Sequence, residues 1–179
     1  MKRILLIFAL LAASLSAMAQ GFSADEGKLS WQFVFPAELT EGAVTMDDIY
    51  KAVIYSDDYT NIVKVSEDIL VARLRPVLLN VEDYGFRRMY TPLYLLHYMI
   101  GPITARIETR EGRYRVTLTN IRITNVTSNF AAIGAVEDIE DYVLTNGAPN
   151  DQLIDYVAPM LGDYFIKTFL FTPQEEEEW

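Results

Sequence analysis

Apolar and polar positions between residues 45 and 58 recur with the period of an α-helix. From residue 46 onward, apolar residues stand at i, i+3, i+4, i+7 and i+8, which places them on one face. Thr45 is a suitable N-cap, and two aspartates follow in the first turn, where negative charge is favourable. The pattern predicts a helix that begins after Thr45, ends at Asp57 and Asp58, and buries this face. Its apolar positions are Met46, Ile49, Tyr50, Val53 and Ile54.

A period of two replaces the helical period over residues 103–123. With a two-residue turn at residues 111–112, one side of the resulting hairpin is apolar and the other polar, as a half-buried hairpin requires. The alternation changes phase after Leu118, and we interpret this change as a β-bulge near Asn120. The pairs expected across the hairpin are Thr109 with Tyr114, Ile107 with Val116, Ala105 with Leu118, Arg110 with Arg113, Glu108 with Arg115, and Arg106 with Thr117.

Three further strands are predicted over residues 29–35, 61–65 and 69–75. Prolines follow the first and third, and proline cannot continue a strand ladder. Residues 20–28 are polar and are predicted to be loose. Residues 77–101 carry no pattern that distinguishes helix from strand.

Helical spacing predicts two more helices. A short one covers residues 132–143 and stops at the turn formed by Asn146 and Gly147. The last helix starts at a cap provided by Asn150 or Asp151, and Pro159 should kink or split it.

The order of these elements predicts the fold class. Strand, helix, four strands and a final helix (β-α-β-β-β-β-α) indicate an α+β fold. We expect an antiparallel sheet of about five strands with two main helices on one face. Residues 20–172 would form a single domain, followed by an acidic tail over residues 173–179.

An N-terminal leader precedes these elements. Lys2 and Arg3 begin the chain, an apolar run covers residues 4–15, and small residues stand one and three places before a possible cut after Ala19. This arrangement is typical of a secretory signal peptide, and the apolar run is too short to span a bilayer. We expect cleavage after Ala19, removal of residues 1–19, and a periplasmic or secreted protein.

Charge and cysteine content narrow the classes of partner. The leader takes two of the 15 basic residues, so 13 remain against 25 acidic ones and the net charge becomes −12. Such a chain is repelled by nucleic acid and by anionic membrane surfaces. The absence of cysteine excludes disulfides, thiolate metal sites and cysteine nucleophiles. No later segment is apolar enough to cross a bilayer, so we expect a soluble exported protein without a transmembrane segment after cleavage.

The hairpin sequence carries a resemblance to a known family. A charged residue, an acidic residue and Gly112 precede Arg113 and Tyr114, and threonines then alternate with apolar residues as far as Ile121. This resembles the exported bacterial proteins with domain of unknown function 4468, which are described as having a TATA-binding-protein-like fold. Residues 29–123 follow the family's layout, and residues 150–170 could supply its closing helix. The resemblance implies this fold and a Bacteroidota-type origin, but no activity, catalytic residue or DNA binding.

Arginine is concentrated in the middle of the chain. All nine arginines beyond the leader lie between Arg73 and Arg122, a stretch with a net charge of +5. Arginine forks suit carboxylates, sulfates and phosphates, so an exposed arginine face would take an anionic partner. The alternative is that these side chains pair with the protein's own acids, such as Glu108, on a solvated face. The hairpin candidates are Arg106, Arg110, Arg113 and Arg115.

Residues 84–98 are rich in aromatic side chains, with Arg87 and Arg88 among them. Aromatic rings beside arginines bind sugars and form interaction hot spots, although aromatic residues also serve as core packing. Arg87, Arg88 and Tyr94 join the hairpin arginines as tentative ligand-binding residues.

Other candidates have ordinary interpretations. The four acids within residues 137–141 could hold calcium, but no EF-hand spacing is present, and a solvated helix face is the simpler interpretation. His97 is the only histidine, and no Gly-x-Ser-x-Gly elbow or phosphate-binding loop accompanies it. We predict no catalytic residue, no metal site and no cofactor.

The expected function is a non-enzymatic binding or interaction module. Its open sheet face and the 84–98 segment would take a negatively charged ligand, such as an anionic glycan or an acidic segment of a protein partner. A carboxylate-based hydrolase and an envelope protein that assembles through its sheet edges are the alternatives.

Overall fold

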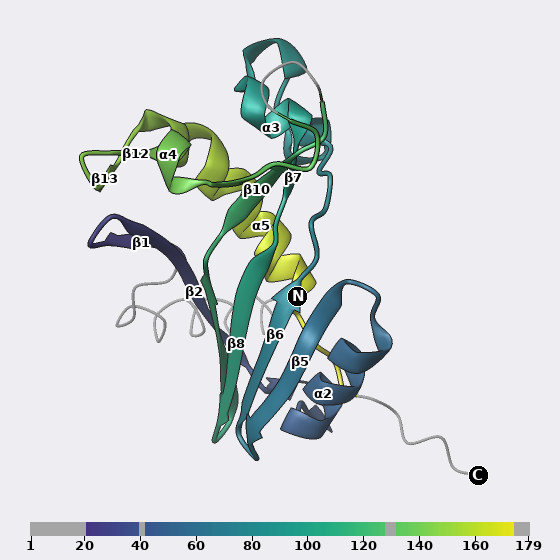
Figure 1. Cartoon of the computed structure of the whole chain (residues 1–179). Coiled ribbons are helices and arrows are strands. Elements are labelled where there is room, and N and C mark those ends of the chain that lie inside the picture. Colours follow the sequence, from purple (N-terminus) through teal and green to yellow (C-terminus); the bar gives the residue numbers. More distant parts are fainter. Residues whose placement is uncertain (1–20, 40–41, 128–131, 174–179) are drawn as a thin grey trace, which may run out of the picture.

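A six-stranded antiparallel sheet forms the centre of the molecule (Figure 1). The computed structural model describes residues 21–39, 42–127 and 132–173; the predicted leader and all but the first residue of the predicted acidic tail lie outside the described residues. The strands follow the order β1-β2-β9-β8-β6-β5. Their bounds are β1 Gly21–Asp25, β2 Lys28–Pro36, β5 Tyr59–Ser66, β6 Ile69–Leu74, β8 Ile103–Arg110 and β9 Arg113–Thr119.

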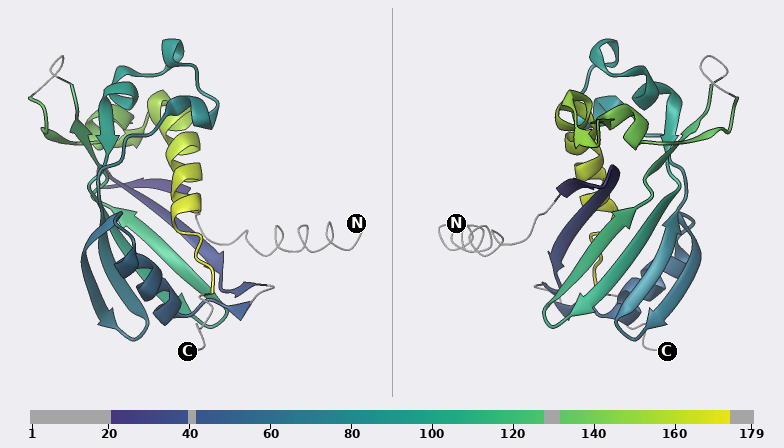
Figure 2. Two further views of the ribbon diagram at one scale, coloured as in Figure 1. Left: turned by 90° about the vertical axis from the view of Figure 1, so that its right-hand side faces the viewer. Right: turned by 60° about the vertical axis from the view of Figure 1, so that its left-hand side comes forward.

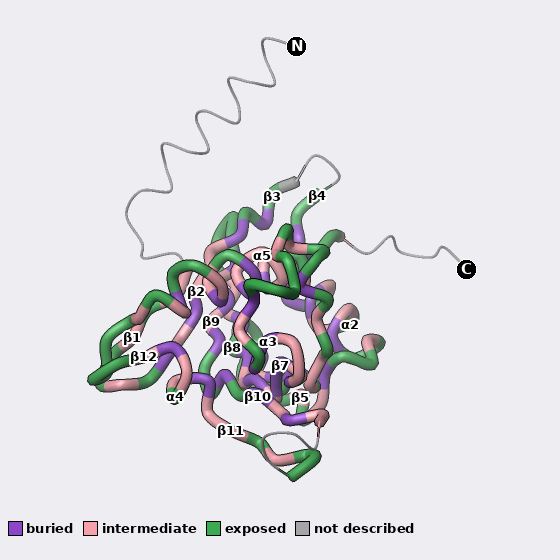
Figure 3. Tube along the Cα trace, turned by 90° about the horizontal axis from the view of Figure 1, so that it is seen from above, coloured by how far each residue is buried: buried purple, intermediate pink, exposed green. Residues whose placement is uncertain are grey.

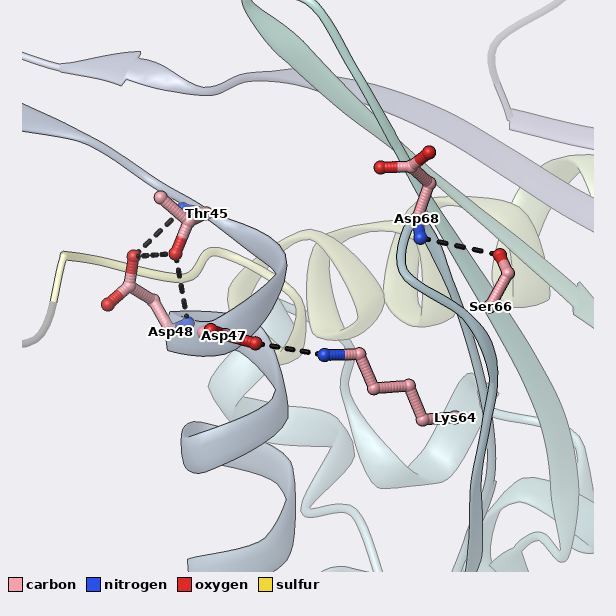
Figure 4. Close-up of polar contacts among 6 residues, drawn as sticks. All are labelled: Thr45, Asp47, Asp48, Lys64, Ser66 and Asp68. Atoms are coloured by element: carbon pink, nitrogen blue, oxygen red, sulfur yellow. Dashed lines mark hydrogen bonds and ion pairs between the residues drawn. The ribbon is translucent and has the colours of Figure 1, made fainter.

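The helix α2 (Met46–Tyr55) begins with a capping box (Figure 4). Thr45 Oγ1 accepts a hydrogen bond from the Asp48 N–H at 3.2 Å, and the Asp48 carboxylate accepts one from the Thr45 N–H at 2.8 Å. These reciprocal bonds satisfy two backbone N–H groups that a helix start leaves open. Lys64 Nζ lies 2.9 Å from Asp47 and ties α2 to the edge strand β5. Met46, Ile49 and Val53 are buried as the periodicity predicts, whereas Tyr50 is half-buried and Ile54 is exposed, so the buried face is narrower than the prediction.

The last helix begins at Asn150, whose side-chain oxygen accepts a hydrogen bond from the Leu153 N–H at 3.3 Å. A wider π-helical turn, η3 (Leu153–Val157), comes first, and α5 (Ala158–Thr168) follows it. Pro159 lies directly after the π turn, so the helix changes its winding there instead of breaking. The predicted kink or split is therefore a local change of helix type.

One connected core lies between the sheet and these two helices. Trp31 of β2 packs edge-on against Phe165 of α5, with ring centroids 5.3 Å apart, and Phe35 stacks on Tyr114 at 5.0 Å. Figure 3 shows the buried positions concentrated in the middle of the molecule and the exposed ones around its periphery. Both helices cover the same face of the sheet, and none of the described helices covers the other face, called the outer face below (Figure 2).

Tyr114 fastens the end of the described chain to the sheet. Its hydroxyl donates a hydrogen bond to the Phe169 carbonyl at 2.9 Å and accepts one from the Phe171 N–H at 3.1 Å. Burial raises the pKa of Tyr114 to about 12, although the bond from Phe171 acts in the opposite direction. The phenol therefore stays protonated at neutral pH and holds the segment after α5 against an interior strand.

Two long segments of the chain, one between β6 and β8 and one after β9, leave the main sheet and pair in a smaller three-stranded sheet. Strands β7 (Tyr98–Ile100) and β11 (Val136–Asp138) both pair with β10 (Arg122–Asn125). The short helices α3 (Leu93–His97) and α4 (Glu140–Val143) directly precede β7 and follow β11. The remaining short elements are the 3-10 turns η1 Val81–Tyr84 and η2 Arg88–Tyr90, and the strand pairs β3 Glu38–Leu39 with β4 Gly42–Ala43 and β12 Leu144–Thr145 with β13 Ala148–Pro149.

The α+β class, the predicted order of the main elements and all six predicted hairpin pairs are confirmed. The strand count was too low by one, because the predicted loose segment contains β1. Glu26 and Gly27 both have positive φ, at 48° and 75°, and they close a two-residue turn that brings β1 beside β2. Such turns match the natural twist of a hairpin, which explains why a polar segment becomes an ordered edge strand.

Two other predictions need correction. The helix expected over residues 132–143 is wrong in its first part, where β11 pairs with β10 and Ile133 and Val136 are exposed. The irregularity at Asn120 is a break between strands and not a bulge within one. Asn120 has φ of 50° and turns the chain out of β9 into β10 of the smaller sheet.

Gly101, between β7 and β8, should not tolerate a side chain. Its φ is +121°, and an added Cβ would lie 2.8 Å from the Pro76 Cα. We expect Gly101→Ala to lower the free energy of unfolding by about 2–3 kcal/mol through backbone strain. Gly162→Ala is the matched control, because no atom within 4 Å meets its Cβ and helical alanine should add about 0.5–1 kcal/mol. Urea unfolding measures both, and an unchanged Gly101→Ala would contradict the predicted clash.

Candidate functional site

The outer face of the main sheet brings the four hairpin arginines together. Arg113 lies opposite Arg110 beside the β8–β9 turn. Arg115 lies opposite Glu108, two residues further from the turn on each strand. Arg106 lies two residues from Glu108 on β8 and so projects from the same face, because side chains alternate along a strand. These five residues are called the arginine face below.

Glu108 neutralises part of the arginine face. Its carboxylate accepts hydrogen bonds from Arg115 Nε at 3.0 Å and from Arg106 Nη2 at 3.1 Å. Partial burial alone would raise the pKa of Glu108, but the hydrogen bonds and charges of the two guanidinium groups outweigh it and hold that pKa below its usual value. Arg106 and Arg115 are therefore partly occupied by an internal acid, as the alternative interpretation of the sequence expected.

Arg110 and Arg113 differ from the other two. Neither forms an ion pair with any acid within the described residues, and both side chains are exposed. Directly opposed like charges destabilise a strand pair, so this arrangement costs some stability. Both residues line a small hollow of about 30 Å³, together with Val34, Glu108 and Arg115. The hollow is large enough for a small polar group, and the arginine face around it keeps a net charge of +3.

The structure places Arg87, Arg88 and Tyr94 elsewhere. They belong to the segment between β6 and β7, at the end of the sheet opposite the β8–β9 turn (Figure 1). Arg87 and Arg88 are exposed around the 3-10 turn η2, whereas Tyr94 is buried in α3. The two groups of candidates therefore do not form one continuous surface, and Tyr94 belongs to a separate pocket.

That separate pocket contains residues that the sequence did not single out. Tyr142 and Gln152 line it beside Tyr94, and they come from α4 and from the start of the last helix. Residues so far apart in the chain share no motif or spacing, so no local signal could have identified them.

The acids within residues 137–141 do not form a calcium site. Glu137 accepts hydrogen bonds from tyrosine hydroxyls, Asp138 pairs with Arg122 at 3.0 Å, and Glu140 accepts the Leu29 N–H at 3.0 Å. The interpretation as one solvated helix face is also wrong, because Glu137 and Asp138 lie in β11. Glu137 and Asp138 therefore hold together the smaller sheet and α4, and Glu140 attaches α4 to β2 of the main sheet.

Residues 21–39, 42–127 and 132–173 contain neither a candidate metal cluster nor a helix that could span a membrane. No group of three or more histidine, cysteine, aspartate or glutamate side chains there could hold a metal ion. His97 is half-buried at the end of α3, and its carbonyl accepts the Val126 N–H at 3.1 Å. Within the same ranges, no helix has the length and apolar character that a bilayer crossing needs.

Comparison with known proteins supports the fold. No family model and no curated protein matches the chain. A solved structure of a DUF4468 family protein from Bacteroides ovatus is similar over 90% of this chain and 96% of its own, with a TM-score of 0.51 and 12% identity. A TBP-like protein from Parabacteroides distasonis covers 82% of this chain and 94% of its own, with a TM-score of 0.49 and 14% identity. The resemblance inferred from the hairpin is thus confirmed as a shared fold.

The Glu108 contacts predict a pH-dependent contribution to stability. Because its pKa is lower in the folded state, ionised Glu108 stabilises the fold above its unfolded pKa near 4.5 and loses this effect as the pH falls through the lower folded value. We expect Glu108→Gln to lower the free energy of unfolding by up to about 1 kcal/mol at pH 7, and by progressively less as the pH falls below 4.5. Urea unfolding across this range measures the difference, and a constant deficit at all pH values would contradict the ion-pair explanation.

Proposed function

We propose that this chain, which shares a TATA-binding-protein-like fold with a DUF4468 family protein, is a non-enzymatic binding module that acts after export to the periplasm or outside the cell. Its outer sheet face would hold an acidic group of a partner. The observation that carries this proposal is the exposed pair Arg110 and Arg113, which has no acid partner within the described chain and borders a hollow. We therefore assign the pair to an external anion.

The chemistry of the hollow favours a carboxylate or sulfate. Guanidinium groups donate paired hydrogen bonds to such groups, and Val34 gives the hollow an apolar wall. The chain as a whole has a net charge of −10, so the arginine face is a positive area on a negative protein. Long polyanions such as nucleic acid would be repelled by the remainder, whereas a locally acidic glycan or peptide would reach the face.

Assembly through sheet edges is less favoured by the geometry. The edge strand β5 has register irregularities at Thr60/Val63 and Lys64/Ser66, and Lys64 lies on it. Irregular pairing and lysine are features that discourage strand addition. The opposite edge, β1, is only five residues long. No contact or distance on the arginine face favours catalysis over binding.

The test is retention of the full chain on immobilised short heparin fragments, short galacturonate oligomers and a short glutamate peptide at low and moderate salt, because short probes avoid repulsion by the acidic remainder of the protein. We expect salt-sensitive binding of at least one probe, and binding at least about tenfold weaker for Arg110→Glu/Arg113→Glu, a loss of about 1.4 kcal/mol or more. Glu108→Gln should bind more tightly, because it releases Arg106 and Arg115 from their internal partner.

The control is Lys51→Glu/Arg87→Glu, which changes the net charge equally through two exposed residues that neither line the hollow nor lie on the outer sheet face. This control should retain most of the binding. Equal loss in both double variants would show that total charge and not the arginine face is responsible. Absence of binding to every probe would refute the proposed anion site. The three probes also separate sulfated glycan, carboxylated glycan and acidic peptide as partners.

A further inference from the structure

The pocket around Tyr94 is independent of the arginine face. It measures about 520 Å³ and lies among α3, β7, α4 and the start of the last helix, which belong to three separate stretches of the chain. This volume is within the range of small-molecule sites. We call it the tyrosine pocket; its walls include Leu93, Tyr94, Tyr98, Asp141, Tyr142 and Gln152.

Two buried polar atoms in this pocket have no partner among the described residues. They are the hydroxyl of Tyr94, a residue only 8% exposed, and the Oε1 atom of Gln152. Buried polar atoms in folded proteins almost always form hydrogen bonds, and each exception requires an explanation. Here both atoms belong to residues that line one pocket, so a single bound molecule could satisfy both. Burial also raises the pKa of Tyr94, which keeps its hydroxyl able to donate as well as accept.

The aromatic walls are fixed in position. The ring of Tyr142 lies 4.7 Å from that of Tyr94 and 6.3 Å from that of Tyr98, measured between centroids. The hydroxyls of Tyr98 and Tyr142 both donate to the Glu137 carboxylate, the former at 3.2 Å. Because these two hydroxyls are already used, the Tyr94 hydroxyl is the one phenol in this group that remains available for a ligand.

The composition of the walls selects a class of ligand. No arginine or lysine lines the pocket, whereas Asp141 is one of its lining residues and Glu137 is hydrogen-bonded to its wall residue Tyr142, so an anion would be repelled. Gln152 Oε1 requires a donor, Tyr94 offers a donor and an acceptor, and Asp141 accepts further donors. Tyrosine faces and the exposed Leu93 provide an apolar surface beside these polar atoms. A ring that presents hydroxyls at its edge and carbon atoms on its face satisfies all of these requirements.

We propose that the tyrosine pocket binds a neutral sugar, in which ring hydroxyls bond to Tyr94, Gln152 and Asp141 while a carbon face of the ring rests against tyrosine. The proposal does not depend on the arginine face. An anionic partner there and a neutral sugar here would engage opposite ends of the molecule.

The experiment is calorimetric titration of the full chain with a panel of neutral methyl hexosides, N-acetylhexosaminides and their disaccharides, with choline as a cationic probe. We expect at least one sugar to bind at millimolar concentration or below, and choline to bind more weakly than that sugar. Tyr94→Phe and Gln152→Leu should each weaken sugar binding at least about tenfold, since the first removes the hydroxyl and the second removes the side-chain amide. The control is Tyr55→Phe, at an 83% exposed tyrosine on α2, and it should bind as the wild type does.

Stability separates a ligand role from a structural one. Because the Tyr94 hydroxyl has no hydrogen-bond partner among the residues that the structure describes, Tyr94→Phe without sugar should unfold at the same temperature as the wild type or slightly higher. A lower unfolding temperature for Tyr94→Phe, together with unchanged sugar affinity, would show that the hydroxyl supports the fold through water and would overturn the proposal. The proposal is also overturned if no sugar binds, or if choline binds more tightly than every sugar. The Arg110→Glu/Arg113→Glu variant should keep its sugar affinity, which separates this proposal from the anion site.

Discussion

The hydroxyl group of Tyr114 joins strand β9 to the C-terminal segment of the described chain by donating to one backbone group and accepting from another. Both backbone partners lie in the segment that follows α5, and the ring itself stacks on Phe35 of β2. A phenol buried this deeply would be costly without such partners, so its position requires the C-terminal segment to lie where it does. That requirement places the last helix on the face of the sheet opposite the outer face. The outer face with its arginines is consequently left open.

Local patterns predicted local structure accurately. The β8–β9 hairpin depends on a short turn and a strict alternation, and its register was predicted pair by pair, including the Glu108–Arg115 contact. The helix α2 was predicted from its spacing and from Thr45 because its cap is also local. Residues 132–143 show the limit of this approach. Their apolar spacing fits a helix, but pairing with β10, from another part of the chain, provides the backbone hydrogen bonds for a strand instead.

The two candidate sites also differ in whether their residues are local or distant in the sequence. Charge counting located the arginine face because four of its residues lie within ten positions of each other on one hairpin. Even so, only the structure separates Arg110 and Arg113 from the two arginines already paired with Glu108. The tyrosine pocket had no comparable signal. Its walls are assembled when β7 and the segment after β10 come together, so the sequence placed Tyr94 among the candidates but not its neighbours.

The sheet order has a consequence for the time at which this protein can fold during its synthesis. Strand β2, near the start of the chain, pairs with β9. Trp31 therefore has no cross-strand neighbour on the β9 side until Leu118 has been synthesised. The helix-covered face of β2 stays uncovered for longer, because the Trp31 indole is covered only after Phe165 has been synthesised. Contacts between such distant residues form slowly compared with local ones. A nascent chain therefore cannot close its core until nearly all of it has been made.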